Sequence, residues 1–95
     1  MTPEVFPDVV ELARSHLAAA LGCVSGDIAV ATVEPVVWND GSLGCARPGM
    51  RYTQAIVPGY KVTLVHAGQR YWYHTDRRRN VVPCSRDVQP LSGAI

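Results

Sequence analysis

The chain has no run of about 20 apolar residues, the length that a membrane-spanning helix needs. It also has no large charge of either sign, because nine Lys and Arg residues oppose eight Asp and Glu residues, for a net charge of +1. A small net charge argues against a partner selected by bulk electrostatics. We therefore expect neither a membrane span nor a nucleic-acid partner, although Arg77-Arg78-Arg79 beside Tyr71-Trp72-Tyr73 has the composition of a small single-strand binding patch.

The chain shows no internal repeat and no linker, and its 95 residues predict a single domain over 1–95. Its first residues contain neither a basic region nor an apolar stretch, so no signal peptide is visible. Two interpretations follow: a cytoplasmic protein, or an exported domain seen without its signal. We favour the second slightly.

Closely spaced metal ligands are missing as well. The three cysteines, Cys23, Cys45 and Cys84, are separated by 22 and 39 residues, whereas structural zinc sites use close pairs. A site built from Cys45, Cys84 and His74 is conceivable, but we expect no metal and no cofactor. The odd cysteine count allows one disulfide and a spare thiol, or three thiols. In an exported protein we favour a Cys45–Cys84 disulfide, worth about 4 kcal/mol, with Cys23 as a buried thiol.

No complete catalytic set is visible. Cys45, together with His66 or His74 and Asp40 or Asp76, has the residue types of a nucleophile, a base and an orienting acid. Nothing in their spacing fixes a geometry, so we predict a non-enzymatic protein with structural roles for these residues. A thiol enzyme or redox protein centred on Cys45 is kept as an alternative.

Pro7 and Asp8 begin a predicted amphipathic helix over about residues 7–21, which Gly22 ends. Apolar residues recur along it at helical spacing, with His16 among them at the edge of the core. Its expected buried stripe is Val9, Leu12, Ala13, His16, Leu17, Ala20 and Leu21.

Strands are predicted over about residues 28–84, and residues 85–95 are expected to form a loosely ordered tail. Pro35 is expected to mark a bulge, an edge or a break, and Pro58-Gly59 to break or bend the strand. The expected strands are 28–38, 52–57, 60–66, 70–74 and 81–84. The predicted fold class is α+β, with one N-terminal helix packed on a four- to five-stranded antiparallel meander sheet.

Between these strands, Trp38 to Gly49 is dense in Gly, Pro and turn residues. Aromatic residues gather in the same half of the chain, and one sheet face would remain exposed beside the loop. Such a surface has the composition of an interaction hot spot, although aromatic pairing across strands would also explain it. We predict that it binds a protein through Trp38, Asp40, Leu43, Tyr52, Gln54, Trp72, His74 and Arg78.

The segments Trp38 to Gly49, Tyr52 to Gln54, Pro58 to Tyr60 and Tyr71 to Thr75, with Cys84, resemble a group of small uncharacterised bacterial proteins. Those proteins share a Trp-Pro-Asp-Gly-Ser-Leu-Gly-Cys core and are often predicted to be exported or lipid-anchored. The resemblance covers about half of the chain and implies no reaction or ligand.

A looser likeness is to the cystatins, which lay one helix across an antiparallel sheet and inhibit papain-like proteases. Residues 54–59 are similar to their Gln-x-Val-x-Gly hairpin, with one extra residue. The likeness implies a protease inhibitor as an alternative, with the 57–59 turn and the 39–49 loop as its wedges.

Overall fold

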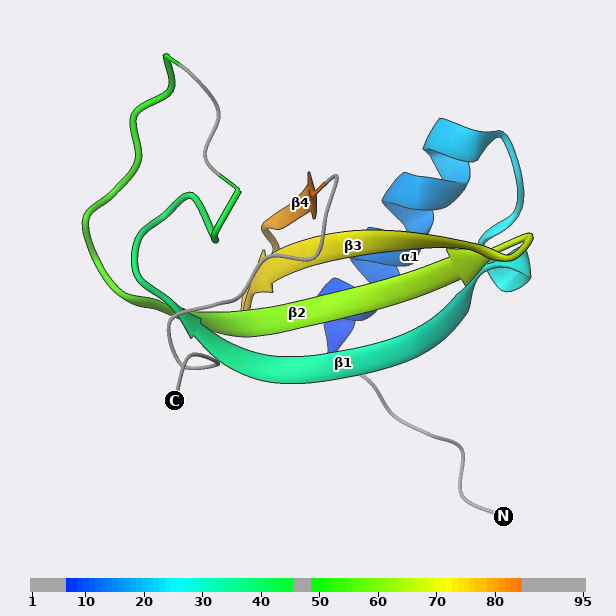
Figure 1. Ribbon diagram of the computed structural model, residues 1–95, viewed down its shortest axis with the longest axis horizontal. Helices are drawn as coiled ribbons and strands as arrows, with labels where there is room; N and C mark the ends of the chain where they lie inside the picture. Colours follow the sequence, from blue (N-terminus) through cyan, green and yellow to red (C-terminus); the bar gives the residue numbers. More distant parts are fainter. Residues whose placement is uncertain (1–6, 46–48, 85–95) are drawn as a thin grey trace.

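A computed structural model describes residues 7–45 and 49–84 of the chain; the expected tail over 85–95 lies outside this part. In the described part, helix α1 (Asp8–Leu21) and the 3₁₀ turn η1 (Ser25–Asp27) precede four strands. These strands are β1 (Ala29–Trp38), β2 (Val57–His66), β3 (Gln69–Asp76) and β4 (Val81–Cys84). They form an antiparallel meander in the order β1-β2-β3-β4, and α1 lies across one face of it (Figure 1). The predicted α+β fold is confirmed.

Helix α1 ends as expected, at Gly22, whose positive φ of 71° closes the last turn. Its buried stripe, however, is rotated from the predicted one: Val10 and Ala18 are buried, whereas Leu12 and Leu21 are 38% and 37% exposed. Ala18 belongs to the core that the helix forms with the sheet. His16 and Ala20, which the predicted stripe also included, are exposed, and Nδ1 of His16 lies 2.7 Å from the hydroxyl oxygen of Tyr73.

The predicted strand over 52–57 and the predicted break at Pro58-Gly59 are wrong. Strand β2 begins at Val57 and runs through both residues. Pro58 pairs with Val37 beyond the last β2–β3 pair, so its missing N–H removes no bond to β3. Gly59 lies between Val36 and Asp76, where the neighbouring strand approaches too closely for a side chain. Pro35 lies in the edge strand β1, as one of its expected roles required.

The sheet separates two groups of buried apolar side chains. The larger core lies under α1, where Val62 and Leu64 of β2 and Tyr73 of β3 pack against the helix. Because side chains alternate along a strand, His74 points to the opposite face from Tyr73. That second face carries a smaller core, here called the loop core, made of Val36, Trp38 and Leu43 with Val57 and Val82 packed against it.

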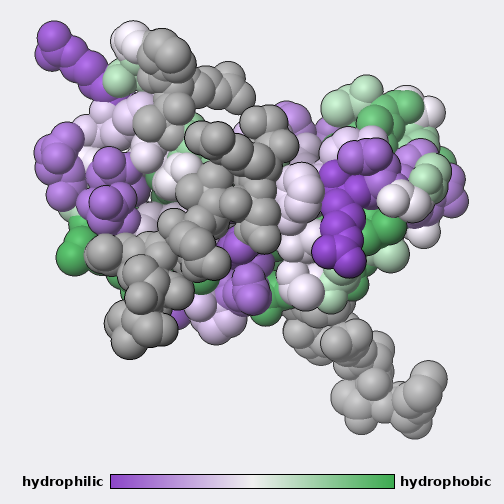
Figure 2. All heavy atoms as spheres, in the orientation of Figure 1, coloured by the Kyte–Doolittle hydropathy of each residue, from purple (hydrophilic) through white to green (hydrophobic). Residues whose placement is uncertain are grey.

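The outer surface mixes hydrophilic and hydrophobic residues, and hydrophobic residues gather where α1 ends (Figure 2). Leu21 and Val24, which is 66% exposed, belong to this end of the molecule. No helix within 7–45 and 49–84 is long and apolar enough to cross a membrane.

Candidate functional site: the loop between β1 and β2

Residues 39–56 connect β1 to β2 and are called here the 39–56 loop; its residues 46–48 lie outside the described part. The predicted turn at Asn39-Asp40-Gly41-Ser42 is present, and the carboxylate of Asp40 closes it. Asp40 Oδ1 accepts hydrogen bonds from the hydroxyl of Ser42 and from its backbone N–H, the latter at 2.9 Å. The Ser42 hydroxyl, and then its N–H, lower the pKa of Asp40.

The two arms of the loop are joined where the N–H of Gly41 donates to the carbonyl oxygen of Thr53, at 2.9 Å. A Cβ at Gly41 would lie within 3.1 Å of the Thr53 backbone nitrogen and would displace the Thr53 hydroxyl, so a glycine favours this approach. Leu43 and Gly44 then take positive φ angles of 56° and 76°. This double reversal directs Leu43, 3% exposed, into the loop core.

The loop packs on the side chains of Trp38 and His74. Their rings are stacked with centroids 4.3 Å apart, and the Trp38 indole N–H donates to the carbonyl oxygen of Thr75 at 2.9 Å. A Cβ on Gly44 would lie 2.9 Å from the Trp38 ring, so the loop backbone lies directly on this ring. Trp38 and His74 are 1% and 0% exposed.

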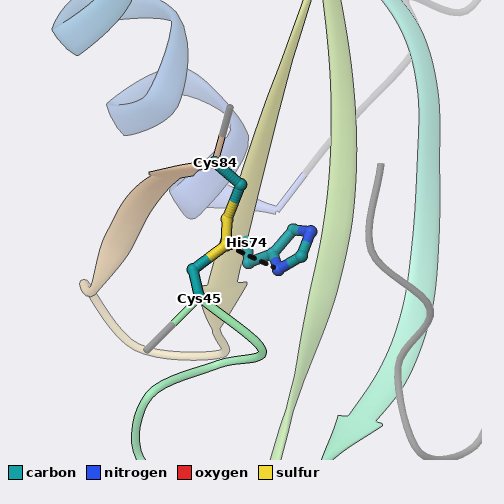
Figure 3. Close-up of side chains that lie close together, drawn as sticks. All are labelled: Cys45, His74 and Cys84. Carbon is teal, nitrogen blue, oxygen red and sulfur yellow. Dashed lines mark hydrogen bonds between the residues drawn. A yellow bond between two sulfur atoms is a disulfide. The ribbon is translucent and has the colours of Figure 1, made fainter. Parts of the chain in front are cut away.

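Cys45 and Cys84 are joined by a disulfide, with their Cα atoms 6.0 Å apart, which ties the loop to the end of β4. The imidazole of His74 lies beside this bridge, with Nδ1 3.5 Å from Cys45 Sγ and 2.7 Å from the carbonyl oxygen of Leu43 (Figure 3). Cys23 is a half-buried free thiol. The two sulfurs and a ring nitrogen of His74 lie within 4.8 Å of one another. In the bridged form they are no metal-ligand set, because zinc is bound by thiolates.

The basic turn between β3 and β4 is organised by Asp76. Its carboxylate accepts from the backbone N–H groups of Arg78 and Asn80, at 2.8 and 3.0 Å, and from the Asn80 side chain at 2.6 Å. Burial alone would raise the pKa of Asp76, but these bonds outweigh it and lower the pKa. The Arg77 guanidinium lies 5.8 Å from the centre of the Tyr60 ring. Arg78 is exposed beside the loop.

A surface hollow brings the loop and this turn together. Gly41, Leu43 and Thr53 line one side of it, and Asp76 and Arg78 line another. Arg78 lines this hollow together with loop residues, Gln54 is exposed on the loop, and Asp40 and Tyr52 are half-buried.

Three of the predicted contact residues, Trp38, Leu43 and His74, are buried, so the expectation that they form an exposed surface is wrong. The loop folds back onto the sheet and uses them as its support. Trp72 is half-buried on β3, opposite Cys84 in the β3–β4 register.

Sequence reasoning overlooked Met50 and Ile56. Their side chains are 60% and 61% exposed, and both lie on the 39–56 loop. Met50 was hidden in a segment rich in Gly and Pro, and Ile56 in the mistaken strand over 52–57. Their exposure could have been inferred from the sequence, because both are large apolar residues that lie between two segments rich in turn residues.

Fold and site together define a small α+β domain in which one helix covers a four-stranded antiparallel meander and a disulfide fastens the longest described connection to the sheet. Residues 10–84 match the family described as a domain of unknown function, DUF8738, and the chain belongs to this family. Neither a curated protein nor a solved structure matches the chain.

Proposed function

We propose that this protein is a non-enzymatic binding domain that presents the 39–56 loop to a protein partner. The observation that carries the proposal is the exposure of Met50 and Ile56, two large apolar side chains, on a loop fastened to the sheet. Exposed apolar side chains on a supported surface are typical of interaction hot spots. Tyr52, Gln54 and Arg78 supply polar groups beside them.

The anchoring supports binding because an ordered loop loses less conformational freedom on association. The loop is held at three described places: the Gly41–Thr53 hydrogen bond, the Leu43 side chain in the loop core, and the Cys45 disulfide. In this proposal the buried Trp38 and His74 act indirectly, by supporting the loop from below. A disulfide of this kind persists in an oxidising compartment, which favours an exported protein.

The test compares two matched double variants in a capture experiment from the protein's native compartment. Met50→Lys with Ile56→Lys alters the loop, and Leu21→Lys with Val24→Lys alters exposed apolar residues at the end of α1. We expect the loop variant to lose captured proteins that the wild type and the helix-end variant both retain. Equal capture by all three proteins, with unchanged melting temperatures, would exclude the loop as the binding surface.

The protease-inhibitor alternative requires two segments, the 57–59 turn and the 39–49 loop, to enter a protease active site. Residues 57–59 lie inside β2 and form no turn, so only the 39–49 loop could do so. A panel of papain-like proteases tests it: inhibition without cleavage of the loop would support this alternative over a general binding domain.

A further inference from the structure

The two sulfurs of the bridge differ in exposure and in their polar neighbours. Cys45 is half-buried at the end of a turn, whereas Cys84, at the end of β4, is 7% exposed. A ring nitrogen of His74 lies 3.5 Å from Cys45 Sγ. Cys84 Sγ instead lies 3.7 Å from the carbonyl oxygen of Val82.

These neighbours favour different protonation states in the reduced pair. Nδ1 of His74 lies 2.7 Å from the Leu43 carbonyl oxygen, which can only accept, so Nδ1 carries a proton. An N–H beside a sulfur favours the thiolate, and a carbonyl oxygen beside a sulfur favours the thiol. In the reduced pair, Cys45 is therefore suited to be the nucleophile. In the bridged form, its greater exposure makes Cys45 Sγ, and not the buried Cys84 Sγ, the sulfur that an incoming thiolate can reach.

Cys45 also opens onto a hollow of about 230 Å³. Apolar side chains dominate its walls, and its described lining carries no charged side chain. Residues from both sides of the bridge contribute to this lining: Cys45, Met50, Tyr52, Val81, Val82 and Pro83. An apolar side chain next to a cysteine in a peptide fits such walls better than a small thiol that carries several charges.

We propose that the Cys45–Cys84 disulfide exchanges with a cysteine of a partner polypeptide, whose apolar neighbours occupy this hollow. Cys45 is the sulfur that forms the mixed disulfide. The His74 Nδ1–H, whose nearer acceptor is the Leu43 carbonyl oxygen, gives Cys45 Sγ a second and longer hydrogen bond that stabilises its thiolate. The hollow shares Met50 and Tyr52 with the loop surface proposed above, but the exchange step itself requires only the bridge and His74, so loss of protein capture and loss of exchange are measured separately.

The exchange balances without a further oxidant or reductant. The partner thiolate attacks Cys45 Sγ, a new S–S bond forms, and the Cys45–Cys84 bond breaks. Cys84 leaves as a thiolate and takes up the proton that the partner thiol released, so that its S–H can donate to the Val82 carbonyl oxygen. The partner sulfur is oxidised to the disulfide level and Cys84 is reduced. Return attack by Cys84 on Cys45 Sγ reverses the step.

The first test uses the oxidised protein with Cys23→Ser, so that no other thiol interferes. It is mixed with a neutral cysteine peptide flanked by leucines or with glutathione, and intact mass and peptide mapping follow the products. We expect the mixed disulfide at Cys45, formed at least tenfold faster with the apolar peptide. Attachment at Cys84, or no opening of the bridge by either thiol, would overturn the proposal. Equal rates for both thiols would refute the peptide preference.

The second test asks whether His74 acts on Cys45 or only supports the fold. In a Cys23→Ser, Cys84→Ser protein, the alkylation rate of Cys45 at neutral pH is compared for His74, His74→Asn and His74→Leu. Asparagine can place an N–H near the position of Nδ1, whereas leucine cannot. We expect about a tenfold slower rate with leucine and near-normal reactivity with asparagine. Equal rates in folded variants, judged by circular dichroism, would show that His74 has no such role.

Discussion

On the second sheet face, His74 contacts the sheet, the loop and the disulfide at once. Its ring stacks on Trp38, its Nδ1 lies against the Leu43 carbonyl oxygen, and the same nitrogen lies beside Cys45. A fully buried polar ring is stabilised only when its environment supplies such partners. His74 therefore connects the loop, the disulfide and the sheet, which no alternation pattern along β3 indicates by itself.

Gly59 occupies a position with no room for a side chain. A Cβ at this position would overlap the carbonyl oxygen of Thr75, a backbone atom that cannot move without shifting β3. Gly59→Ala should lower the free energy of unfolding by about 2–3 kcal/mol, as overpacking does in tight interiors. Urea unfolding measures this change. Gly26→Ala is the matched control, since its Cβ would meet nothing within 4 Å, and a similar loss in both variants would contradict the steric explanation.

The carboxylate of Asp76 should make the stability of the fold depend on pH. Its folded pKa is lowered, so its ionised form stabilises the protein above the ordinary carboxyl pKa of 3.8, and this contribution is lost as the pH falls through the folded value. Asp76→Asn should destabilise by about 1–2 kcal/mol at pH 6, because charge-assisted hydrogen bonds are lost. The difference between wild type and variant should shrink below pH 4. Thermal melts from pH 6 to pH 2.5 would reveal a constant difference if this assignment were wrong.

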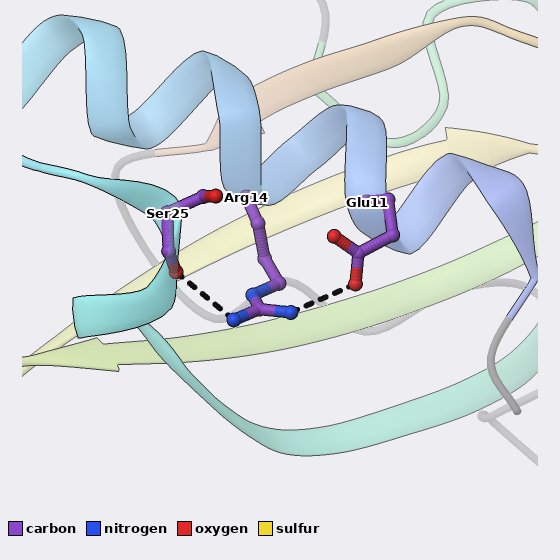
Figure 4. A network of polar contacts seen from close by, with 3 residues as sticks. All are labelled: Glu11, Arg14 and Ser25. Atoms are coloured by element: carbon purple, nitrogen blue, oxygen red, sulfur yellow. Dashed lines mark hydrogen bonds and ion pairs between the residues drawn. The ribbon is translucent and has the colours of Figure 1, made fainter. Parts of the chain in front are cut away.

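At the scale of elements, α1 is joined to the segment before β1 by Arg14. Its guanidinium contacts Glu11 on the same helix at 2.8 Å and donates to the carbonyl oxygen of Ser25 at 2.9 Å (Figure 4). The first contact is a surface ion pair of small value. The second is a part-buried, charge-assisted hydrogen bond to the Ser25 carbonyl oxygen, which also accepts from the N–H of Ile28. The link to Ser25 therefore matters more for holding the helix end.

Two variants separate these contacts. Arg14→Ala removes both and should cost about 1–2 kcal/mol, because the hydrogen bond that the charged guanidinium donates to the Ser25 carbonyl oxygen is lost. Glu11→Ala removes only the ion pair and should cost less than about 0.5 kcal/mol. Guanidinium unfolding followed by circular dichroism measures both. Equal losses would mean that the ion pair, and not the bond to Ser25, carries the stability.

Strand elements also show where reading the sequence succeeds and fails. Regular alternation from Tyr60 to His66 predicted the middle of β2 correctly, and Val81 to Cys84 has the predicted bounds of β4. The start of β2 was missed because proline and glycine usually interrupt strands. Here Pro58 lies beyond the β2–β3 ladder, and Gly59 is required by the close approach of β3. Both reasons are tertiary and cannot be seen in one segment.

On the scale of the whole molecule, the fold class could be predicted because helical and alternating periodicities follow one another along the chain. The candidate site could be predicted only in part. Turn residues located the loop, and cysteine positions suggested the Cys45–Cys84 pairing, which the structure contains. The burial of Trp38 and Leu43 could not be foreseen, because it depends on a loop that turns back through positive φ angles onto the sheet.

The Cys45–Cys84 disulfide contributes to the stability of the whole domain by linking the 39–56 loop to β4. A crosslink between residues 39 positions apart restricts the unfolded chain by about 4 kcal/mol in the loop-entropy treatment. A domain of this size is stable by about 5–14 kcal/mol, so the bridge supplies a large share of the total. The core under α1 contains neither Cys45 nor Cys84 and should fold without the bridge.

We therefore expect the Cys45→Ser, Cys84→Ser variant to remain folded but to melt about 15–30 °C lower than the wild type. Cys23→Ser, which leaves the bridge intact, is the control and should melt within a few degrees of the wild type. In a Trp72→Phe background, near-ultraviolet circular dichroism of Trp38, which lies under the loop, reports whether the loop core loosens before the helix does. An unchanged melting temperature in the double serine variant would mean that the loop core alone holds the loop in place.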